Sequence, residues 1–383
     1  MNKICILISI FLLTASLSGC GEEQEKIQPS GKSIRIGFIG PVSGPDKVLG
    51  GDSLKGVQTV LHMEPYLSNG DTIELLVEDD KNDPALAVKA FKKLVEKDKV
   101  TALIVASSSG AALAINELAD HYQTPVVILL ASHPDISKET KYVSQITFDN
   151  TFQAKVAALF VRDELLLERV AVFTNPDSYH SKSLSEEFIR KFRSIEGEID
   201  DVVSVSQATT DYGEILSHLR DRDVQLLYLP MAVENVIEIS KELQAIGWSP
   251  EVMGGDGLLT RVFAEKRDDT QYLEGFFATD LYSNNMEMTV YGRKVVKGFH
   301  SLFEKKNSTF VAIGVEGMAI LMNAVNRCKE SSDKECINSK LHATVDFEGL
   351  LGNITIQPDG KALRALAVNR IREDQLEFVV KVY

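Results

Sequence analysis

The sequence predicts an α/β protein with two doubly wound lobes, each built on a mainly parallel sheet that helices cover on both faces. The first observation is that short β-branched, apolar runs alternate with helical patterns from residue 33 onward. The second is that this alternation restarts after Phe148 and produces another half of similar size. The third is length, because the roughly 360 residues after position 19 exceed one small core and suit two lobes.

The first half of the chain alternates strands and helices in regular order. Its strands are short, β-branched runs, of which 125–130 is fully apolar, and the helix at 52–66 is amphipathic. Pro84 marks the start of one helix, because proline fits the first helical turn. The expected strands are 34–39, 72–78, 100–105 and 125–130, and the expected helices are 52–66, 84–97 and 110–121.

The second half repeats this order, and the last third of the chain departs from it. Pro358-Asp359-Gly360 predicts a turn between two strands near the C-terminus. The helices expected in the second half are 152–165, 178–195, 212–220 and 233–246, and its strands are 169–174, 201–205, 225–229 and 251–254. The last third has expected helices at 288–304, 310–327 and 335–341, followed by strands near Ile354 and at 365–372 and 376–382.

The N-terminus carries the pattern of a secretion signal. Lys3 precedes an apolar run over 4–13, which ends in small residues and is shorter than the about 20 residues that span a bilayer. Leu17-Ser18-Gly19-Cys20 resembles the lipobox of bacterial lipoproteins, which implies removal of residues 1–19 and a lipid on Cys20. An ordinary cleaved signal with an incidental cysteine is the alternative. Residues 20–33 then form the lipidated cysteine and a flexible tether, so we expect the protein in the bacterial cell envelope, anchored to a membrane and facing the periplasm or exterior.

Composition and charge exclude several classes of function. The net charge of −14 repels polyanions, so we expect no nucleic-acid partner. Outside the cytoplasm Cys328 and Cys336 would normally pair in a disulfide, and two free thiols are the alternative. No His or further Cys stands at metal-ligand spacing near these cysteines, and we expect neither a metal nor a cofactor.

A series of short motifs stands in a characteristic order along the chain. Among them are Gly37-Phe38-Ile39-Gly40-Pro41, Glu78-Asp79-Asp80, Ser107-Ser108-Ser109, Gly254-Gly255-Asp256-Gly257 and Gly349-Leu350-Leu351-Gly352. Together they resemble the leucine/isoleucine/valine-binding protein family of the type I periplasmic binding fold, from about Ile34 to the C-terminus.

The resemblance implies a particular domain organisation. Two lobes are joined by a hinge of three crossovers, and a ligand lies in the cleft between lobes that close on it. The crossovers are expected near Phe148, Ala278 and Gly349, which gives an N-lobe of 34–147 with 279–349 and a C-lobe of 148–278 with 350–383.

The first candidate binding element is the serine run that follows an apolar strand and opens a helix. A helix N-terminus offers unpaired N–H groups and a partial positive charge, which suit a carboxylate. Simple capping by Ser109 is the alternative reading of this run. The resemblance implies that Ser107, with Ser108 beside it, holds the ligand carboxylate.

The second candidate element is Asp256, which lies among three glycines after a strand. Without the resemblance an Asp-Gly turn explains it equally well. The resemblance implies that an acidic residue here binds the ammonium group of an α-amino acid. The serine run and Asp256 would then clamp the two ends of a zwitterion.

Further residues of the cleft follow from the resemblance. Leu130 and Ser132 follow the next strand and would face the ligand, and Tyr179 would pack on it from the C-lobe. Leu49 and Ala232 stand where the family often has aromatic residues, which implies a wider or more aliphatic pocket.

These features predict a solute-binding receptor of an ABC importer, which captures an amino acid or similar small polar solute. Its expected partners are the small ligand, the transmembrane subunits of an ABC permease and a membrane through the lipid, and we expect a monomer. The alternative is a lipoprotein of the same fold that acts as a protein-interaction regulator, such as a cell-wall enzyme activator, or as a ligand sensor. We find no Walker loop, H-E-x-x-H or G-x-S-x-G motif, so we do not expect an enzyme.

Overall fold

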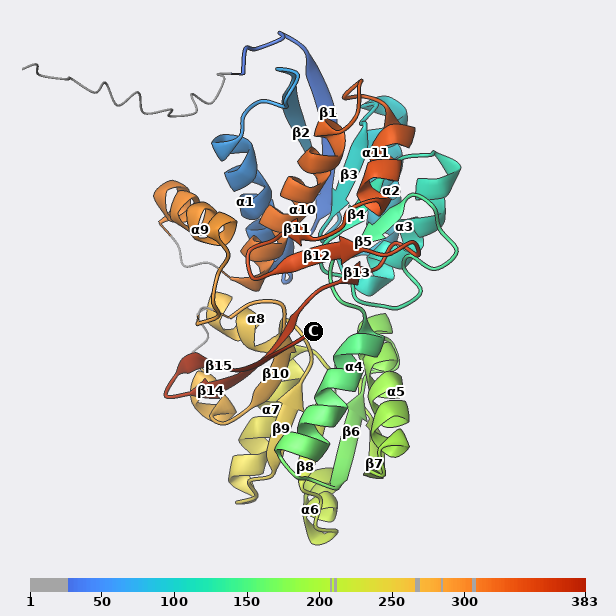
Figure 1. Cartoon of the computed structure of the whole chain (residues 1–383). Coiled ribbons are helices and arrows are strands. Elements are labelled where there is room, and N and C mark those ends of the chain that lie inside the picture. The colour runs from blue at the N-terminus through green and yellow to red at the C-terminus, as the bar shows by residue number, and fades with distance from the viewer. Residues whose placement is uncertain (1–26, 207–208, 210–211, 266–268, 284, 305–307) are drawn as a thin grey trace, which may run out of the picture.

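The computed structural model has two lobes, stacked one above the other in Figure 1, and confirms the predicted α/β fold. It describes residues 27–206, 209, 212–265, 269–283, 285–304 and 308–383. The predicted signal, the lipid site at Cys20 and most of the tether lie outside the described residues.

The N-lobe is organised around a five-stranded parallel sheet. Its strand order is β2-β1-β3-β4-β5, so each strand after the first two extends the sheet in one direction. All four residues of β3 are buried, as its apolar sequence requires with helices on both faces. The strands are β1 (Ser33–Gly40), β2 (Thr72–Asp79), β3 (Ala102–Val105), β4 (Val126–Ile128) and β5 (Val143–Gln145), and the helices are α1 (Lys47–Met63), α2 (Pro84–Lys92), a π-helical turn (Lys93–Lys97), α3 (Ser109–His121), α9 (Val290–Phe303), α10 (Thr309–Asn326) and α11 (Lys334–His342).

The C-lobe is organised around a seven-stranded sheet of order β15-β14-β10-β9-β8-β6-β7. Its first five strands along the chain are parallel, whereas β14 pairs antiparallel with β10, and β15 pairs antiparallel with β14 at the edge of the sheet. The strands are β6 (Arg169–Thr174), β7 (Glu198–Ser204), β8 (Leu226–Leu229), β9 (Glu251–Gly254), β10 (Phe277–Asp280), β14 (Leu366–Arg372) and β15 (Gln375–Val382). The helices are α4 (Asn150–Leu159), a π-helical turn (Phe160–Glu164), α5 (Tyr179–Ser194), α6 (Gly213–Asp221), α7 (Val233–Ala245), α8 (Leu258–Ala264) and a 3-10 turn (Thr270–Leu273).

A small third sheet lies on the N-lobe side of the hinge. It consists of β11 (Phe347–Glu348), β12 (Asn353–Ile356) and β13 (Ala362–Leu363), and Gln145 of β5 bridges to Lys361. The chain therefore enters the C-lobe sheet only at β14, and the crossover expected near Gly349 falls after Arg364 instead.

The buried side chain of Arg364 holds the chain in place just before this last crossover. Its buried guanidinium lies 2.8 Å from Glu316 of α10 and donates to the carbonyl of Ile146, 3.0 Å away, at the first crossover. The same carboxylate accepts from the backbone N–H of Leu350 at 2.8 Å. A buried charge needs such partners, so one ion pair holds three separate chain segments together.

The backbones of α1 and α10 are in direct contact where the two helices cross. A Cβ atom added to Gly314 would lie 2.0 Å from the carbonyl oxygen of Ser53, and one added to Gly56 would lie 2.2 Å from that of Val311. Helix α10 is the one described helix with the length and apolar composition to cross a membrane, and 89% of it is buried inside the protein. Its all-round hydrophobicity is therefore that of a core helix.

Two further features position the ends of these elements. Helix α1 begins at Lys47, five residues before the expected start, because Gly50 lets its first turn approach Pro41 closely: an added Cβ would lie 2.4 Å from the Pro41 oxygen. Cys328 and Cys336 are joined by a disulfide with a Cα–Cα distance of 5.9 Å, which ties the end of α10 to the start of α11.

Candidate functional site

A cavity of about 310 Å³ lies between the lobes, at the carboxyl ends of the strands of both sheets. Ligands of open α/β sheets lie at this edge, because the loops that follow the strands meet there. Six of the seven predicted binding residues line the cavity, namely Leu49, Ser107, Ser108, Leu130, Ser132 and Asp256.

The N-lobe wall is formed at the start of α3. Ser107 is buried and donates its hydroxyl proton to Asp80, and burial raises the pKa of that carboxyl above its ordinary value. The backbone N–H of Ser108, the residue before the helix, donates to Asn82 Oδ1 at 2.9 Å. The Ser107 hydroxyl and the Ser108 backbone N–H therefore already have acceptors within the N-lobe, whereas the Ser108 hydroxyl has none among the described residues.

Ser109 is a second residue of this wall with unused hydrogen-bonding capacity. Its Oγ is buried and has no protein partner in the part of the chain that the structure describes. As the first residue of α3 it also starts the turn whose N–H groups lack intrahelical acceptors. The predicted serine run lies beside the cavity at the start of α3, and within the described residues the hydroxyls of Ser108 and Ser109 accept or donate no hydrogen bond to the protein.

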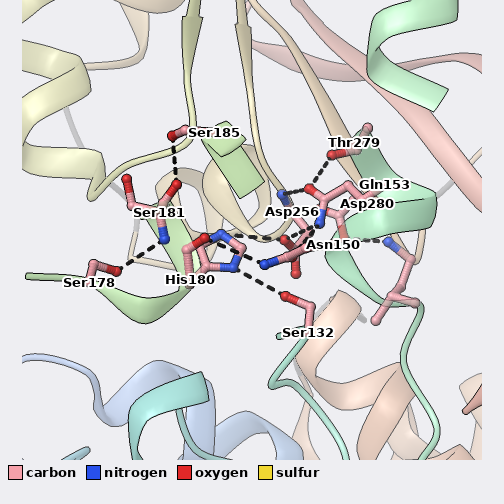
Figure 2. A network of polar contacts seen from close by, with 11 residues as sticks. Ser132, Asn150, Gln153, Ser178, His180, Ser181, Ser185, Asp256, Thr279 and Asp280 are labelled. Carbon is pink, nitrogen blue, oxygen red and sulfur yellow. Dashed lines mark hydrogen bonds and ion pairs between the residues drawn. The ribbon is translucent and has the colours of Figure 1, made fainter. Parts of the chain in front are cut away.

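The C-lobe wall is formed by Asp256, which follows β9. Gln153 Nε2 donates to Asp256 Oδ1 at 2.8 Å, and the Asp256 backbone N–H donates to Gln153 Oε1 at 2.8 Å (Figure 2). His180 Nε2 lies 3.6 Å from the same carboxylate oxygen. The Asp256 side chain is 15% exposed, so it retains access to the cavity.

His180 occupies the place that the sequence predicted for Tyr179. The His180 Nδ1 lies 3.1 Å from Ser132 Oγ of the N-lobe, so the imidazole connects the two lobes at the cavity (Figure 2). Tyr179 is 59% exposed and contacts His133 edge-on in a neighbouring surface hollow. Adjacent residues of a helix point about 100° apart, so a shift of one position exchanges the two side chains. No sequence signal distinguished the two positions.

An ion pair crosses the cleft at another edge of the cavity. Arg261 of α8 lies 3.1 Å from Asp46 of the N-lobe, and it also lies 2.6 Å from Glu265 and 3.6 Å from Glu234. Asn82 donates to the second oxygen of Asp46 at 2.8 Å. Three carboxylates surround this one guanidinium, so its charge is compensated. Sequence reasoning missed Arg261 because its partner Asp46 lies in the other lobe.

The remaining wall of the cavity is apolar. Met231, Ala232 and Val233 come from the loop after β8 and the start of α7. Leu49, Leu130, Leu258, Leu281 and Phe310 complete this apolar surface. A ligand with polar groups at one end and a hydrocarbon side chain at the other matches this division.

No metal centre accompanies these residues: in the described ranges, no three His, Cys, Asp or Glu side chains are grouped so as to hold an ion.

Known proteins resemble this chain along nearly its whole length. A protein-family model described as periplasmic binding protein matches residues 33–375. The Leu/Ile/Val-binding protein homolog 3 of Brucella melitensis is 22% identical over 338 residues, which cover 85% of this chain and 88% of that protein.

Solved structures show the same fold. The leucine-binding protein LivK of Thermotoga maritima has a TM-score of 0.85 at 24% identity, with 91% of this chain and 98% of that chain covered. The branched-chain amino acid binding protein LivJ of Streptococcus pneumoniae, in complex with isoleucine, has a TM-score of 0.82 at 22% identity, with 91% and 99% covered. The family match spans almost all described residues, and the chain therefore belongs to the periplasmic binding protein family.

Proposed function

We propose that this chain is the extracytoplasmic receptor of an ABC importer and captures an α-amino acid with an apolar side chain between its lobes. The observation that carries the proposal is the polarity of the cavity. The anionic Asp256 lies on the C-lobe wall, the start of α3 lies on the N-lobe wall, and an apolar surface lies beside both. The relatives that bind leucine or isoleucine support the same solute class.

The two walls suit the two ends of a zwitterion. Asp256 would accept hydrogen bonds from the ligand ammonium, while Ser109 Oγ and the first N–H groups of α3 would donate to its carboxylate. Closing the lobes removes both charges from water, so these bonds must offset the desolvation. The volume of about 310 Å³ is at the small end for ligand pockets and favours a single amino acid over a peptide.

The envelope location and the membrane anchor rest on the family and on the N-terminal sequence. Family members act outside the cytoplasm, and the disulfide between Cys328 and Cys336 fits an oxidising compartment. A lipid on Cys20 would keep the receptor at the membrane, where the permease subunits recognise its closed form.

The test is a binding screen on the soluble form, residues 21–383. Each of the common amino acids is added in thermal-shift assays, and hits are quantified by calorimetry, since a ligand of the native state raises Tm. Asp256→Asn keeps the shape and removes the charge, so we expect affinity for the hit to fall about tenfold or more. Ser109→Ala should weaken the same hit.

Asp374→Asn is the matched control. Asp374 is exposed, far along the chain in the β14–β15 turn, and its left-handed backbone suits asparagine. We expect wild-type affinity for this variant. Unchanged binding by Asp256→Asn would refute the ammonium assignment, and a screen without any hit would favour the protein-interaction regulator instead.

A further inference from the structure

Asp256 is held in place by one buried side chain, Gln153 of α4. The Gln153 amide and the Asp256 residue form a reciprocal pair, in which Nε2 donates to Oδ1 and Oε1 accepts from the Asp256 N–H, both at 2.8 Å (Figure 2). Gln153 is fully buried, so this pair is shielded from solvent. One bond holds the Asp256 backbone and the other holds its carboxylate oxygen Oδ1, so a single buried amide restrains the side chain at both ends.

A third contact fixes the orientation of the amide itself. Thr279 Oγ1 of β10 donates to Gln153 Oε1 at 2.7 Å, and Asn150 Oδ1 lies 3.4 Å from Gln153 Nε2. An amide turned by 180° would present its NH₂ group to the Asp256 N–H, which is itself a donor, so one orientation satisfies the network. Gln153, Asp256 and Thr279 all belong to the C-lobe, so this network does not depend on a contact between the lobes.

The network also distinguishes the two carboxylate oxygens of Asp256. Oδ1 accepts from Gln153 and lies near His180, whereas Oδ2 accepts no hydrogen bond from the residues that the structure describes. Oδ2 is therefore the oxygen that can accept a hydrogen bond from a ligand, and Gln153 determines its position.

We propose that Gln153 is the positioning residue of the ammonium subsite, and that through Asp256 it sets the preference of the receptor for solutes that carry an amino group. This inference rests on the proposed function. It adds to that function a residue, Gln153, that does not contact the solute. The effect of Gln153 is limited to binding of the amino group of the solute. Preorganised partners lower the cost of ordering a site on binding, so loss of Gln153 should act on the amine alone.

The test compares aliphatic L-amino acids with the carboxylic acids that lack only the amino group, such as L-leucine with 4-methylpentanoate. Gln153→Met preserves volume and removes both hydrogen-bonding functions. Gln153→Leu removes the same functions with a branched side chain of similar size, so the two variants differ mainly in shape. We expect both variants to lose about tenfold or more in affinity for the amino acid, while affinity for the desamino acid stays within about twofold.

Gln225→Met is the matched control. The Gln225 amide also accepts from backbone N–H groups of the C-lobe, those of Glu168 and Arg169, but it lies at the end of the sheet away from the cavity. We expect this variant to bind both solutes as the wild type does. In the background of Asp256→Asn, Gln153→Met should have no further effect on amino-acid affinity, because its target is absent.

The outcomes separate this inference from the proposed function. Equal losses for the amino acid and the desamino acid in both Gln153 variants would indicate a structural role and overturn the inference. Amino-acid affinity within about twofold of wild type in both variants would overturn it as well. If Asp256→Asn itself leaves amine selectivity unchanged, the ammonium assignment fails first, and the role of Gln153 fails with it.

Discussion

Asp280 is a fully buried carboxyl group at the seam between the lobes. It accepts hydrogen bonds at 2.6 Å from Thr260 of the C-lobe and from Thr309 of the N-lobe, and at 2.7 Å from the N–H of Leu281. Burial raises the pKa of Asp280 to about 6, and the nearby Asp256 charge acts in the same direction. The native state therefore binds this proton more tightly than the unfolded chain does. The bound proton therefore stabilises the native state against unfolding. This contribution is complete below about pH 4 and is lost as pH rises through about 6.

Asp280→Asn should remove this pH dependence. Asparagine still accepts from a threonine and carries no charge, so we expect the Tm of the variant relative to wild type to be higher at pH 7.5 than at pH 4.5. The relative change is at most on the order of 3 kcal/mol. Thermal unfolding across this pH range measures it, and parallel Tm curves for the two proteins would contradict the assignment.

At the scale of single residues, the sequence predicted which residues line the cavity better than it predicted their hydrogen-bond partners. The serine run and Asp256, chosen through the family resemblance, line the cavity because loops at the carboxyl ends of strands meet in this fold. Gln153 was missed because its partner lies 103 residues away, and nothing in the local sequence marks that contact. Tyr179 was chosen over His180 because helical phase depends on where the helix begins.

At the scale of elements, the alternation of strands and helices was predictable because hydrophobic periodicity determines it locally. The exceptions have tertiary causes. Gly50 and Gly51 have poor helical propensity, yet α1 includes both because Gly50 packs against Pro41. The sheet β11-β12-β13 joins the N-lobe through the bridge between Gln145 and Lys361, which no periodicity reveals.

The crossing of α1 and α10 provides a second prediction. In Gly314→Ala the new Cβ would lie 2.0 Å from the Ser53 oxygen, so the helices must move apart, and we expect a loss of about 1–3 kcal/mol in unfolding free energy. Gly51→Ala, on α1 with open space around the added Cβ, is the control. It should leave stability equal or slightly higher, because alanine is the better helix former. Urea denaturation compares the two, and wild-type stability for Gly314→Ala would show that the crossing tolerates a side chain.

At the scale of the whole molecule, two polar contacts join the lobes, and we expect them to favour the arrangement in which the lobes meet. The pair Asp46–Arg261 at 3.1 Å and the contact Ser132–His180 at 3.1 Å both border the cavity. A solute that bridges the lobes adds its own contacts to these, so its measured affinity depends on how much of the protein is closed beforehand.

Asp46→Asn should therefore shift the molecule toward the open form. We expect a larger radius of gyration in small-angle X-ray scattering without solute, and solute affinity lower by about threefold to tenfold. Glu234→Gln is the control, because Glu234 lies near Arg261 within the C-lobe and its change leaves the cross-lobe pair intact. Identical scattering and affinity for Asp46→Asn and wild type would show that the ion pair does not contribute to closure.

The antiparallel hairpin β14–β15 has a consequence for biogenesis. Leu366 onward supplies two strands of the C-lobe sheet, and α9, α10 and α11 of the N-lobe precede them only narrowly in the chain. A polypeptide that emerges N-terminus first thus lacks part of the C-lobe sheet until Leu366 and the residues after it have emerged. The N-lobe elements are complete first, so the edge of β10 that later pairs with β14 stays exposed to chaperones and proteases in the meantime.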